Sequence, residues 1–369
     1  MKTVRDIPVL ENVPVLLRTS QAMNEVRLRE ALPTIRFLTE RHARVILATH
    51  VSGTGTESSM PMYEAVRKLI PDIRWCPVAV GEEARAAVRD LPPGGVLMLE
   101  NLRRNPGEEK NDPEFAKELA ALADVFVQDA FDTCHREHAS IVLVPGLLSS
   151  YAGLTLEKEV AELTKALKPA RPALAVIGGA KFSTKEPVLK ALLRSYDHVF
   201  VGGALANDFL KAKGYSVGVS LVSEEGQAHI RELLKNSRLL TPVDVVAAAP
   251  QATRESGRAA ALADVREGEA ILDAGPKTAA ALVELVNRAK TVLWNGPLGL
   301  FEQGFTDATD ALATATVNAR AYSIIGGGDT IAAIAPLRIE DRFSFVSTGG
   351  GAMLDFLAQG TLPGIRALG

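Results

Sequence analysis

The regular alternation of short β-branched runs with longer amphipathic stretches is the feature that most constrains the fold of this chain. Each short run has the length and composition of a buried strand, and each longer stretch has the period of a helix. Strand and helix in alternation are typical of a parallel sheet with helices on both faces. In the first half, the predicted strands are 13–17, 44–49, 95–100 and 124–128, and the predicted helices lie near 26–41, 60–70, 82–90 and 113–123.

The second half of the chain repeats this alternation. A helical pattern over 155–167, followed by Lys168-Pro169-Ala170-Arg171-Pro172, lies between the halves and is the candidate connector. We therefore predict an α/β protein with two doubly wound parallel-sheet domains joined by a hinge helix. The strands predicted in the second half are 173–177, 198–201, 243–247, 291–294, 322–325 and 343–346.

Glycines cluster where the strands of the second half are predicted to end. In doubly wound sheets, ligands bind beyond the carboxyl ends of strands, so these glycines favour a nucleotide or phosphate site. The alternative is that they only supply turns with positive φ, but packing alone explains several such turns in one domain poorly. The clusters are Gly178-Gly179, Gly202-Gly203, Gly296 and Gly326-Gly327-Gly328.

The last glycine cluster leads into Asp329, Thr330 and an Ala/Ile helical pattern. The first amides of such a helix are unpaired and carry the positive end of its dipole, so they can cradle a phosphate. Asp329 is placed to hold a magnesium ion against that phosphate, and Thr330 adds a hydroxyl.

Lys181 and Lys185 follow the first glycine cluster. If a helix begins there, their spacing puts both on one face, where they present two positive charges to a polyphosphate. The alternative is a solvated helix face. No G-x-x-x-x-G-K-[ST] pattern occurs near them, which disfavours the P-loop class of nucleotide-binding proteins.

In the first half, basic residues follow the predicted strands: Arg18, His50, Arg103 and the pair His135-Arg136. Each alone is typical of a surface residue. Together, at equivalent ends of one sheet, they would converge on one crevice and suit a small anionic ligand. The role of Arg27, in the first helical pattern, does not follow from its spacing.

The composition excludes several classes of partner. The chain has 369 residues and a formal net charge of -3, so no overall charge attracts nucleic acid or an anionic membrane. No apolar run is long enough to cross a bilayer, and the first residues do not lead into a signal-peptide core. The two cysteines, Cys76 and Cys134, fit a reducing compartment, so we expect a cytoplasmic protein that binds small molecules.

Several stretches, in this order along the chain, resemble one known family. They are RLREALPTI (27–35), LENLRRNPGEEKNDPEFAKELA (99–120), HREHAS (135–140), GGAKFSTK (178–185), FLKAKG (209–214), PVDVV (242–246), DAGPKT (273–278), TVLWNGPLGLFE (291–302), GGGDT (326–330) and STGGGA (347–352). Over essentially its whole length, the chain resembles phosphoglycerate kinase. The resemblance implies two α/β lobes that close about a hinge, with 3-phosphoglycerate in the first lobe and MgATP or MgADP in the second.

The resemblance also implies the domain limits and the reaction. The acceptor domain would span 1–153, with 352–369 packing back on it, the interdomain helix 154–168, and the nucleotide domain 169–351. The implied function is phosphoryl transfer between MgATP or ADP and 3-phosphoglycerate or 1,3-bisphosphoglycerate in glycolysis. The implied cofactor is Mg²⁺, and the implied assembly is a monomer.

The resemblance gives each candidate site residue a role. Lys185 would lie on the nucleotide phosphates, Lys181 at the transferred phosphoryl group and Glu302 on the ribose hydroxyls. The implied catalytic residues are Arg27, Lys181, Lys185, Gly327 and Gly328. The implied nucleotide-binding residues are Lys185, Gly202, Gly203, Gly275, Asn295, Glu302, Gly327, Gly328, Asp329 and Thr330, with Asp329 on the metal. The implied substrate-binding residues are Arg18, Ser20, Arg27, His50, Gly53, Arg103 and Arg136.

The chain departs from the family pattern at both predicted sites. Ser20 stands where the family has the aspartate of R-V-D-F-N, so the carboxylate that grips the acceptor's hydroxyl is missing, and Ser20 or Asn24 would be weaker substitutes. Gly53 replaces an arginine of the anion clamp. Ile271 puts a branched side chain where a glycine lets the adenine approach the backbone, which predicts a narrower pocket.

These departures leave three hypotheses open. The first is a working phosphoglycerate kinase with a remodelled acceptor loop. The second is a kinase for another small anionic acceptor, and the third is a catalytically impaired paralogue that acts as a binding protein. The phosphoryl-transfer group favours the first hypothesis because all its members are present: Arg27, Lys181, Lys185, Asp329 and Thr330.

Overall fold

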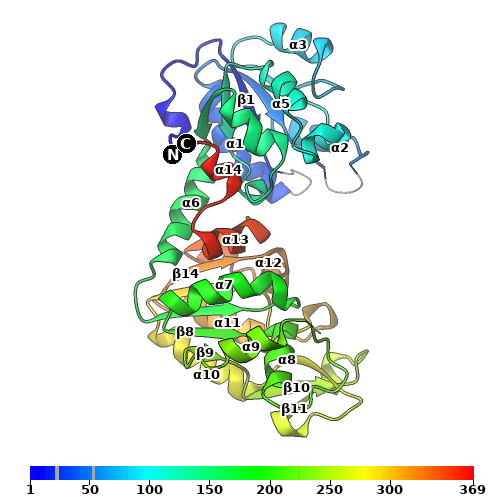
Figure 1. Ribbon diagram of the computed structural model, residues 1–369, viewed down its shortest axis with the longest axis vertical. Helices are drawn as coiled ribbons and strands as arrows, with labels where there is room; N and C mark the ends of the chain where they lie inside the picture. Colours follow the sequence, from blue (N-terminus) through cyan, green and yellow to red (C-terminus); the bar gives the residue numbers. More distant parts are fainter. Residues whose placement is uncertain (21–24, 52–54, 224) are drawn as a thin grey trace. The chain divides into compact units, whose positions relative to one another are not determined.

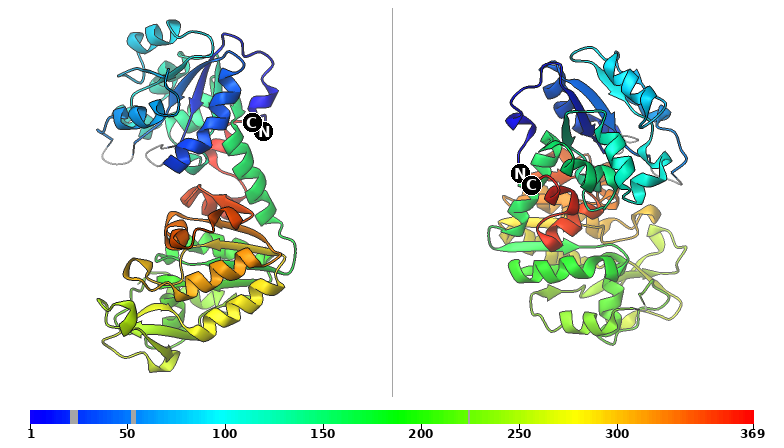
Figure 2. Two further views of the ribbon diagram at one scale, coloured as in Figure 1. Left: turned by 180° about the vertical axis from the view of Figure 1, so that it is seen from behind. Right: turned by 45° about the horizontal axis from the view of Figure 1, so that its top comes forward.

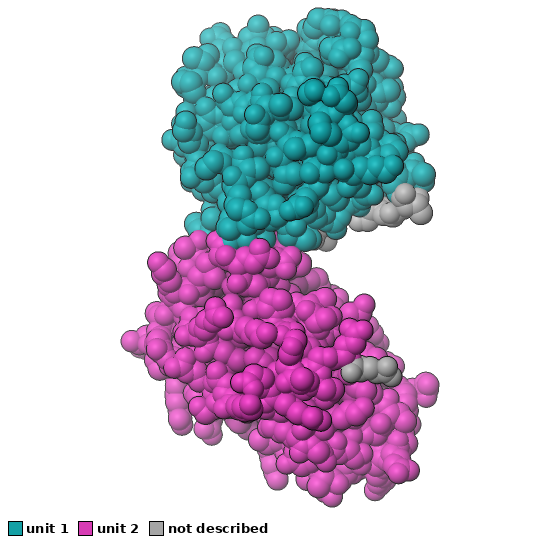
Figure 3. Space-filling model, in the orientation of Figure 1, with its two compact units in different colours: residues 1–161, 361–369 teal, residues 162–360 magenta. Residues whose placement is uncertain are grey.

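The computed structural model describes residues 1–20, 25–51, 55–223 and 225–369, with the backbone alone for 25–28. The chain forms two compact units (Figure 3). Unit 1 contains Met1–Ala161 and Thr361–Gly369, and unit 2 contains Glu162–Gly360. Among the described residues, no helix combines the length and the apolar character that crossing a bilayer requires.

Unit 1 is built on a six-stranded sheet in which each neighbouring pair of strands is parallel (Figure 1). The strands are β1 (Pro14–Arg18), β2 (Arg44–Ala48), β3 (Arg74–Trp75), β4 (Val96–Met98), β5 (Val125–Gln128) and β6 (Ser149–Ala152), in the order β3-β4-β2-β1-β5-β6. The helices are α1 (Glu25–Thr39), α2 (Met60–Arg67), α3 (Glu82–Arg89), α4 (Pro106–Glu109), α5 (Pro113–Ala120) and α14 (Pro363–Arg366).

The core of unit 1 explains why its central strands read as continuous apolar runs. Val15 and Leu17 of β1 pack with Ile35 and Leu38 of α1, while Leu16, between them, is also fully buried. Successive side chains of a strand point to opposite faces, so both faces of β1 are covered. The order of the strands places the carboxyl ends of β1, β2, β4 and β5 next to one another at one edge of the sheet.

Unit 2 also contains a six-stranded sheet of parallel pairs. Its strands are β7 (Ala173–Ile177), β8 (His198–Val201), β9 (Leu239–Leu240), β13 (Thr291–Asn295), β14 (Tyr322–Gly326) and β15 (Phe345–Ser347), in the order β15-β14-β13-β7-β8-β9. The helices are α7 (Phe182–Ser195), α8 (Gly203–Ala212), α9 (Gln227–Leu233), α10 (Pro276–Arg288), α11 (Asp307–Asn318), α12 (Gly328–Ile334) and α13 (Gly351–Gln359).

Helices cover both faces of this second parallel sheet. Figure 1 shows α7 in front of the sheet, and the view from behind in Figure 2 shows α10 and α11, in yellow and orange, on the opposite face. The predicted fold class, an α/β protein with two doubly wound parallel sheets, is therefore confirmed.

One predicted strand of the second half belongs to a different sheet. Residues 243–247 were expected in the parallel sheet, but β10 (Asp244–Ala248) pairs antiparallel with β11 (Arg258–Ala261) and β12 (Ala270–Ala274) in a three-stranded sheet. The connection from β10 to β11 contains only the short 3₁₀ turn Arg254–Ser256, whereas a parallel crossover needs a dozen or more residues, usually with a helix. The apolar run alone does not distinguish these cases.

Helix α6 (Leu154–Leu167) runs from unit 1 into unit 2. Its start is fixed by Asp129 beyond the end of β5, whose Oδ1 accepts hydrogen bonds from the amides of Thr155 (2.8 Å) and Leu156 (3.1 Å). Gly153 fits there because a Cβ atom at this position would lie 2.2 Å from Asp129 Oδ1. The first turn of α6 is thus held by the sheet of unit 1.

The segment that returns to unit 1 is shorter than expected. Residues 352–369 were predicted to pack back on the first domain, but α13 belongs to unit 2. Only Thr361–Gly369 belongs to unit 1, where the Gly364 amide donates a hydrogen bond to the Cys134 carbonyl at 2.9 Å. The apolar face of α13 is buried through Met353 and Phe356, which explains why this helix stays with the second core.

Burial raises the pKa of Asp129 to about 7, although the amides of α6 favour its ionised form. A pKa above the ordinary value means that the contribution of Asp129 to stability is present at low pH and is lost as the pH rises from about 4 to about 7. The Asp129→Asn variant keeps an acceptor oxygen but does not titrate. Across this pH window, the unfolding free energy of unit 1 should therefore change less in the variant than in the parent, by about 4 kcal/mol.

The measurement is denaturant unfolding followed by the fluorescence of Trp75. Trp294 is replaced by Phe in both the parent and the variant, so that the fluorescence signal comes from unit 1 alone. An Asp124→Asn variant, at the exposed opposite end of β5, serves as the control. If the Asp129→Asn chain kept the full pH dependence of its parent, the assigned titration would be wrong.

Candidate functional site

Basic side chains meet at the carboxyl edge of the sheet of unit 1. Arg18 ends β1, His50 follows β2, Arg103 follows β4 and Arg136 follows β5; we call these four residues the basic cluster. Arg18 Nη2 lies 3.1 Å from His50 Nδ1. Burial, together with the positive charges of the three arginines, lowers the pKa of His50, so this imidazole is neutral. The structure brings together four of the five basic residues that the sequence placed at equivalent strand ends, Arg18, His50, Arg103 and Arg136.

Arg18 is the buried centre of this cluster, with only 1% of its surface exposed. Its Nε donates to Ser140 Oγ at 2.9 Å, and its Nη1 donates to the Thr19 carbonyl. Ser140 in turn donates from Oγ to Glu108 Oε1 at 2.6 Å and from its amide to Glu108 Oε2 at 2.9 Å. Burial lowers the pKa of Arg18, and the charge of Glu108 opposes that effect. The buried arginine is therefore balanced by a fully buried carboxylate through one serine.

Sequence reasoning had not singled out Glu108 and Ser140. Both lie within stretches that carry the family resemblance, but on the sequence alone Glu108 reads as a surface acid of a short helix. The signal that could have identified the pair is chemical, since a buried arginine requires a buried acceptor.

Arg103 presents donors that the described residues do not fully satisfy. Its side chain is 8% exposed, and its Nε forms an ion pair with Glu109 Oε1 at 3.0 Å. Among the described residues, no hydrogen-bond acceptor meets its buried Nη2. Buried donors are nearly always paired, so this group fits an anionic ligand that supplies the missing acceptor.

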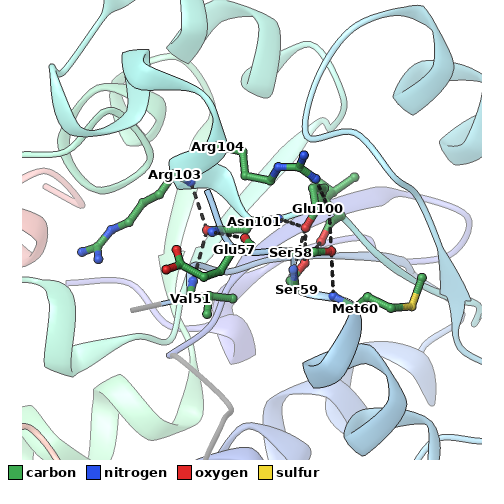
Figure 4. A network of polar contacts seen from close by, with 10 residues as sticks. Val51, Glu57, Ser58, Ser59, Met60, Glu100, Asn101, Arg103 and Arg104 are labelled. Carbon is green, nitrogen blue, oxygen red and sulfur yellow. Dashed lines mark hydrogen bonds and ion pairs between the residues drawn. The ribbon is translucent and has the colours of Figure 1, made fainter. Parts of the chain in front are cut away.

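A polar network holds the backbone of Arg103 in place (Figure 4). Asn101 Oδ1 accepts hydrogen bonds from the amides of Arg103 and Val51, both at 3.1 Å, and its Nδ2 donates to the Glu57 carbonyl at 2.8 Å. Glu100, beside it, accepts from the Ser59 amide at 2.6 Å. The network ties the segment after β4 to the loop after β2, so two members of the basic cluster share one support.

The remaining predicted residues of unit 1 are placed only in part. Ser20 donates from Oγ to Asp132 Oδ1 at 2.6 Å, a partner that the sequence did not suggest. Gly53 and Asn24 lie outside the described residues, as does the side chain of Arg27. Their predicted roles stay predictions.

Unit 2 contains a cavity of about 400 Å³, a volume typical of small-molecule sites. Of the predicted nucleotide-binding residues, Gly203, Glu302 and Asp329 line it, and Ile271 lies in its wall as expected. Most of the wall is apolar. The other lining residues include Ala180, Asn207, Leu210, Val219, Leu221, Pro242, Val245, Asp273, Leu298 and Leu300.

Two polar residues of this cavity had not been predicted. Asn207 of α8 is 1% exposed, and its Nδ2 donates to the Leu221 carbonyl at 3.0 Å, while its Oδ1 has no hydrogen-bond partner among the described residues. Burial raises the pKa of Asp273 to about 7, with the amides of Ala308 and Ala274 acting in the opposite direction. For Asn207 the sequence signal is a polar residue inside an otherwise apolar pattern, whereas Asp273 also begins the stretch DAGPKT that carries the family resemblance.

Several of the predicted glycines are explained by packing. A Cβ atom on Gly178 would lie 2.4 Å from the Pro297 carbonyl oxygen, and one on Gly296 would lie 2.4 Å from the Gly178 carbonyl carbon. Gly203 has φ +61° and faces the same proline carbonyl at 2.9 Å. The loops after β7, β8 and β13 therefore touch through their backbones. The alternative interpretation, turns and close packing, accounts for these positions.

At the other predicted glycines, an added Cβ atom would either collide with neighbouring atoms or enter open space. A Cβ atom on Gly202 would lie 2.5 Å from Leu298 Cδ2, and one on Gly275 would lie 2.5 Å from Asp244 Oδ2. Gly275 does not line the cavity. At Gly327 the φ of +99° requires glycine, whereas Gly328 meets nothing within 4 Å. Packing therefore does not explain the glycine at position 328, which is exposed.

The two predicted lysines differ in position. Lys181 is the exposed N-cap residue of α7 and has an extended backbone, so the argument from helical spacing does not apply to it. Lys185 lies within the helix and crosses over Gly179, where its Nζ donates to Asn295 Oδ1 at 3.4 Å. Burial lowers the pKa of Lys185, while the charges of Asp329 and Asp355 oppose this shift.

Thr330 is fully buried and lies behind the cavity wall. Its Oγ1 donates to the Gly326 carbonyl at 2.8 Å and accepts a hydrogen bond from the Gly296 amide at 2.7 Å. Asp329, by contrast, is exposed and lines the cavity. The turn after β14 therefore presents Asp329 and the backbone of Gly328, while Thr330 joins it to the loop after β13.

A model of the phosphoglycerate kinase family matches residues 9–360 of the chain. The chain belongs to the phosphoglycerate kinase family. The phosphoglycerate kinase of Roseiflexus sp. strain RS-1 is 41% identical over 100% of this chain and 98% of its own length. A phosphoglycerate kinase of Thermus thermophilus is 44% identical over 97% of this chain and 94% of its own length.

Solved phosphoglycerate kinase structures have the same fold. The enzyme from Coxiella burnetii gives a TM-score of 0.87 at 36% identity, over 99% of this chain and 98% of that one. The enzyme from Pyrococcus horikoshii OT3 gives a TM-score of 0.89 at 30% identity, over 100% of this chain and 98% of that one. These similarities confirm the predicted enzyme, a phosphoglycerate kinase that transfers a phosphoryl group in glycolysis. Nothing in them favours a different acceptor or a non-catalytic role, and the individual site residues stay predictions.

Arg103 and its neighbour provide a matched test of the basic cluster. Arg103→Met should weaken binding of 3-phosphoglycerate about 10- to 100-fold, because a buried guanidinium contributes charge-assisted hydrogen bonds to an anion. The control is Arg104→Met, the same change at a guanidinium that is directed to Glu100 instead (Figure 4). Calorimetry measures both, and equal losses in the two variants would contradict an anion site at Arg103.

Proposed function

We propose that the cavity of unit 2 binds MgATP or MgADP and that the basic cluster of unit 1 binds 3-phosphoglycerate or 1,3-bisphosphoglycerate. The observation that carries this proposal is a half-buried lysine, Lys185, that lies beside Asn295 and over Gly179, a residue of the wall of an apolar cavity of nucleotide size. Apolar walls suit a base, and a cationic end suits phosphates. The reaction then needs little covalent chemistry from the protein, because phosphoryl transfer depends on positioning and charge.

The nucleotide would lie along the cavity with its phosphates toward Lys185. Ile271, Leu298 and neighbouring apolar residues would contact the base, and Glu302 would accept hydrogen bonds from the ribose hydroxyls. Lys181 and Lys185 would neutralise phosphate oxygens, and the exposed amide of Gly328 would donate to them. Thr330 would act as a positioning residue, since its hydroxyl already joins two loops.

The acceptor would be held by the basic cluster. Arg18, Arg103 and Arg136 supply positive charge, and neutral His50 supplies a ring nitrogen. Because Arg18 is buried and anchored through Ser140, its guanidinium is already oriented before the ligand arrives. A preoriented anion site binds without the entropy cost of ordering long side chains.

The described residues also fit a magnesium ion that arrives with the nucleotide. Among them, no group of three His, Cys, Asp or Glu side chains could hold a metal ion. Mg²⁺ usually takes only one or two carboxylates together with substrate phosphates, and Asp329 offers one carboxylate on the cavity wall. When bound, the ion would neutralise phosphate oxygens during transfer. The hinge closure, monomeric state and cytoplasmic location expected from the sequence stay predictions.

Lys185 tests the proposed reaction. Lys185→Ala should lower kcat for ATP and 3-phosphoglycerate about 100- to 1,000-fold, because a preoriented charge at the transferring group is lost, while the KM for 3-phosphoglycerate changes little. A coupled assay of both substrates measures this. Lys190→Ala, an exposed lysine of the same helix that pairs with Glu186, is the control and should keep the parental rate. A parent without activity on this substrate pair would refute the proposal.

Asp329 tests the metal site. Asp329→Asn should weaken binding of MgADP about tenfold and leave binding of ADP without metal nearly unchanged, since one charged ligand of the ion is removed. Calorimetry with and without Mg²⁺ gives both values. The control is Asp355→Asn. Asp355 also places a negative charge near Lys185 but does not line the cavity, so this variant should bind MgADP more tightly than ADP to the same extent as the parent. An unchanged magnesium effect in Asp329→Asn would exclude Asp329 as a ligand.

A further inference from the structure

The acceptor proposed for unit 1 carries a hydroxyl group as well as a phosphate and a carboxylate. The members of the basic cluster are hydrogen-bond donors, apart from one nitrogen of neutral His50. They suit the anionic groups but do not select the hydroxyl, which is best held by an ionised carboxylate. The inference below rests on the proposed function and concerns which residue supplies that carboxylate.

Asp132 lies where such a carboxylate is needed. It belongs to the 3₁₀ turn Phe131–Thr133, which follows β5 at the carboxyl edge of the sheet, next to β1. It is half-buried, it accepts a hydrogen bond from Ser20 Oγ at 2.6 Å, and its charge acts on Arg18. A carboxylate can accept several hydrogen bonds at once, so the bond from Ser20 is compatible with a bond from a ligand.

Three other acids near the basic cluster are engaged in contacts of their own or exposed. Glu108 is fully buried and accepts from both the amide and the hydroxyl of Ser140. Glu109 pairs with Arg103 through a side chain that is 53% exposed. Asp129 is buried beneath the first turn of α6. Asp132 is half-buried and follows β5, the neighbour of β1 in the sheet.

We propose that Asp132 supplies the carboxylate that recognises the acceptor's hydroxyl, in place of the aspartate that is absent at Ser20. Ser20 occupies the expected strand end but has only a hydroxyl, and that hydroxyl donates to Asp132. The carboxylate thus comes from the segment after β5 instead of the segment after β1. Asp132 would set the specificity for an acceptor with a hydroxyl next to its carboxylate.

The test compares 3-phosphoglycerate with 3-(phosphonooxy)propanoate, which lacks the hydroxyl, by calorimetry on the full chain. Asp132→Asn keeps an oxygen that can accept the bond from Ser20 but removes the charge. It should weaken binding of 3-phosphoglycerate about 10- to 100-fold and leave the affinity for the analogue unchanged or higher. Asp124→Asn, at the opposite end of β5, is the matched control and should change neither affinity.

A double variant, Ser20→Asp with Asp132→Ser, exchanges the two side chains and should restore most of the lost preference for the hydroxyl. If Asp132→Asn weakened the binding of both ligands equally, or of neither, the proposed role of Asp132 would be wrong while the proposed function stood. A parent that binds no 3-phosphoglycerate would refute the proposed function itself.

Discussion

The pairing of the buried Arg18 charge is the interaction on which the carboxyl edge of the sheet in unit 1 depends. A buried guanidinium remains stable only when its donors are paired and a negative charge lies nearby, and Ser140 and Glu108 meet both needs. This arrangement fixes the geometry of the carboxyl edge of the sheet. Burial, together with the charge of Arg18, lowers the pKa of His50, so the basic cluster combines permanent positive charge with an uncharged ring.

In unit 2, the corresponding constraint is the contact between backbones. The loops after β7, β8 and β13 approach so closely that a single Cβ atom at Gly178 or Gly296 would collide with main-chain atoms. The buried hydroxyl of Thr330 joins the loop after β13 to the turn after β14. Such a close-packed block holds Lys185 and Asp329 on a rigid support, as the proposed phosphate site would require.

The alternation of strand and helix predicted both parallel sheets, because buried parallel strands read as plain apolar runs. The same signal failed at β6, whose sequence SSYA is largely polar, and at β3, which has two residues. It assigned β10 to the wrong sheet because pairing partners are not encoded in the run itself. At the sites, strand ends predicted Arg18 and His50, but Glu108, Asp132 and Asn207 depend on contacts between distant segments.

The way in which the chain divides between the units has a consequence for its biosynthesis. Unit 1 consists of Met1–Ala161 and Thr361–Gly369, so the whole of unit 2 is inserted into it. A ribosome completes residues 162–360 before the segment that contacts Cys134 emerges. Unit 2 can therefore fold as soon as it is synthesised, whereas unit 1 is complete only after residues 361–369 have been added. This vectorial order of folding is set by the connectivity of the chain.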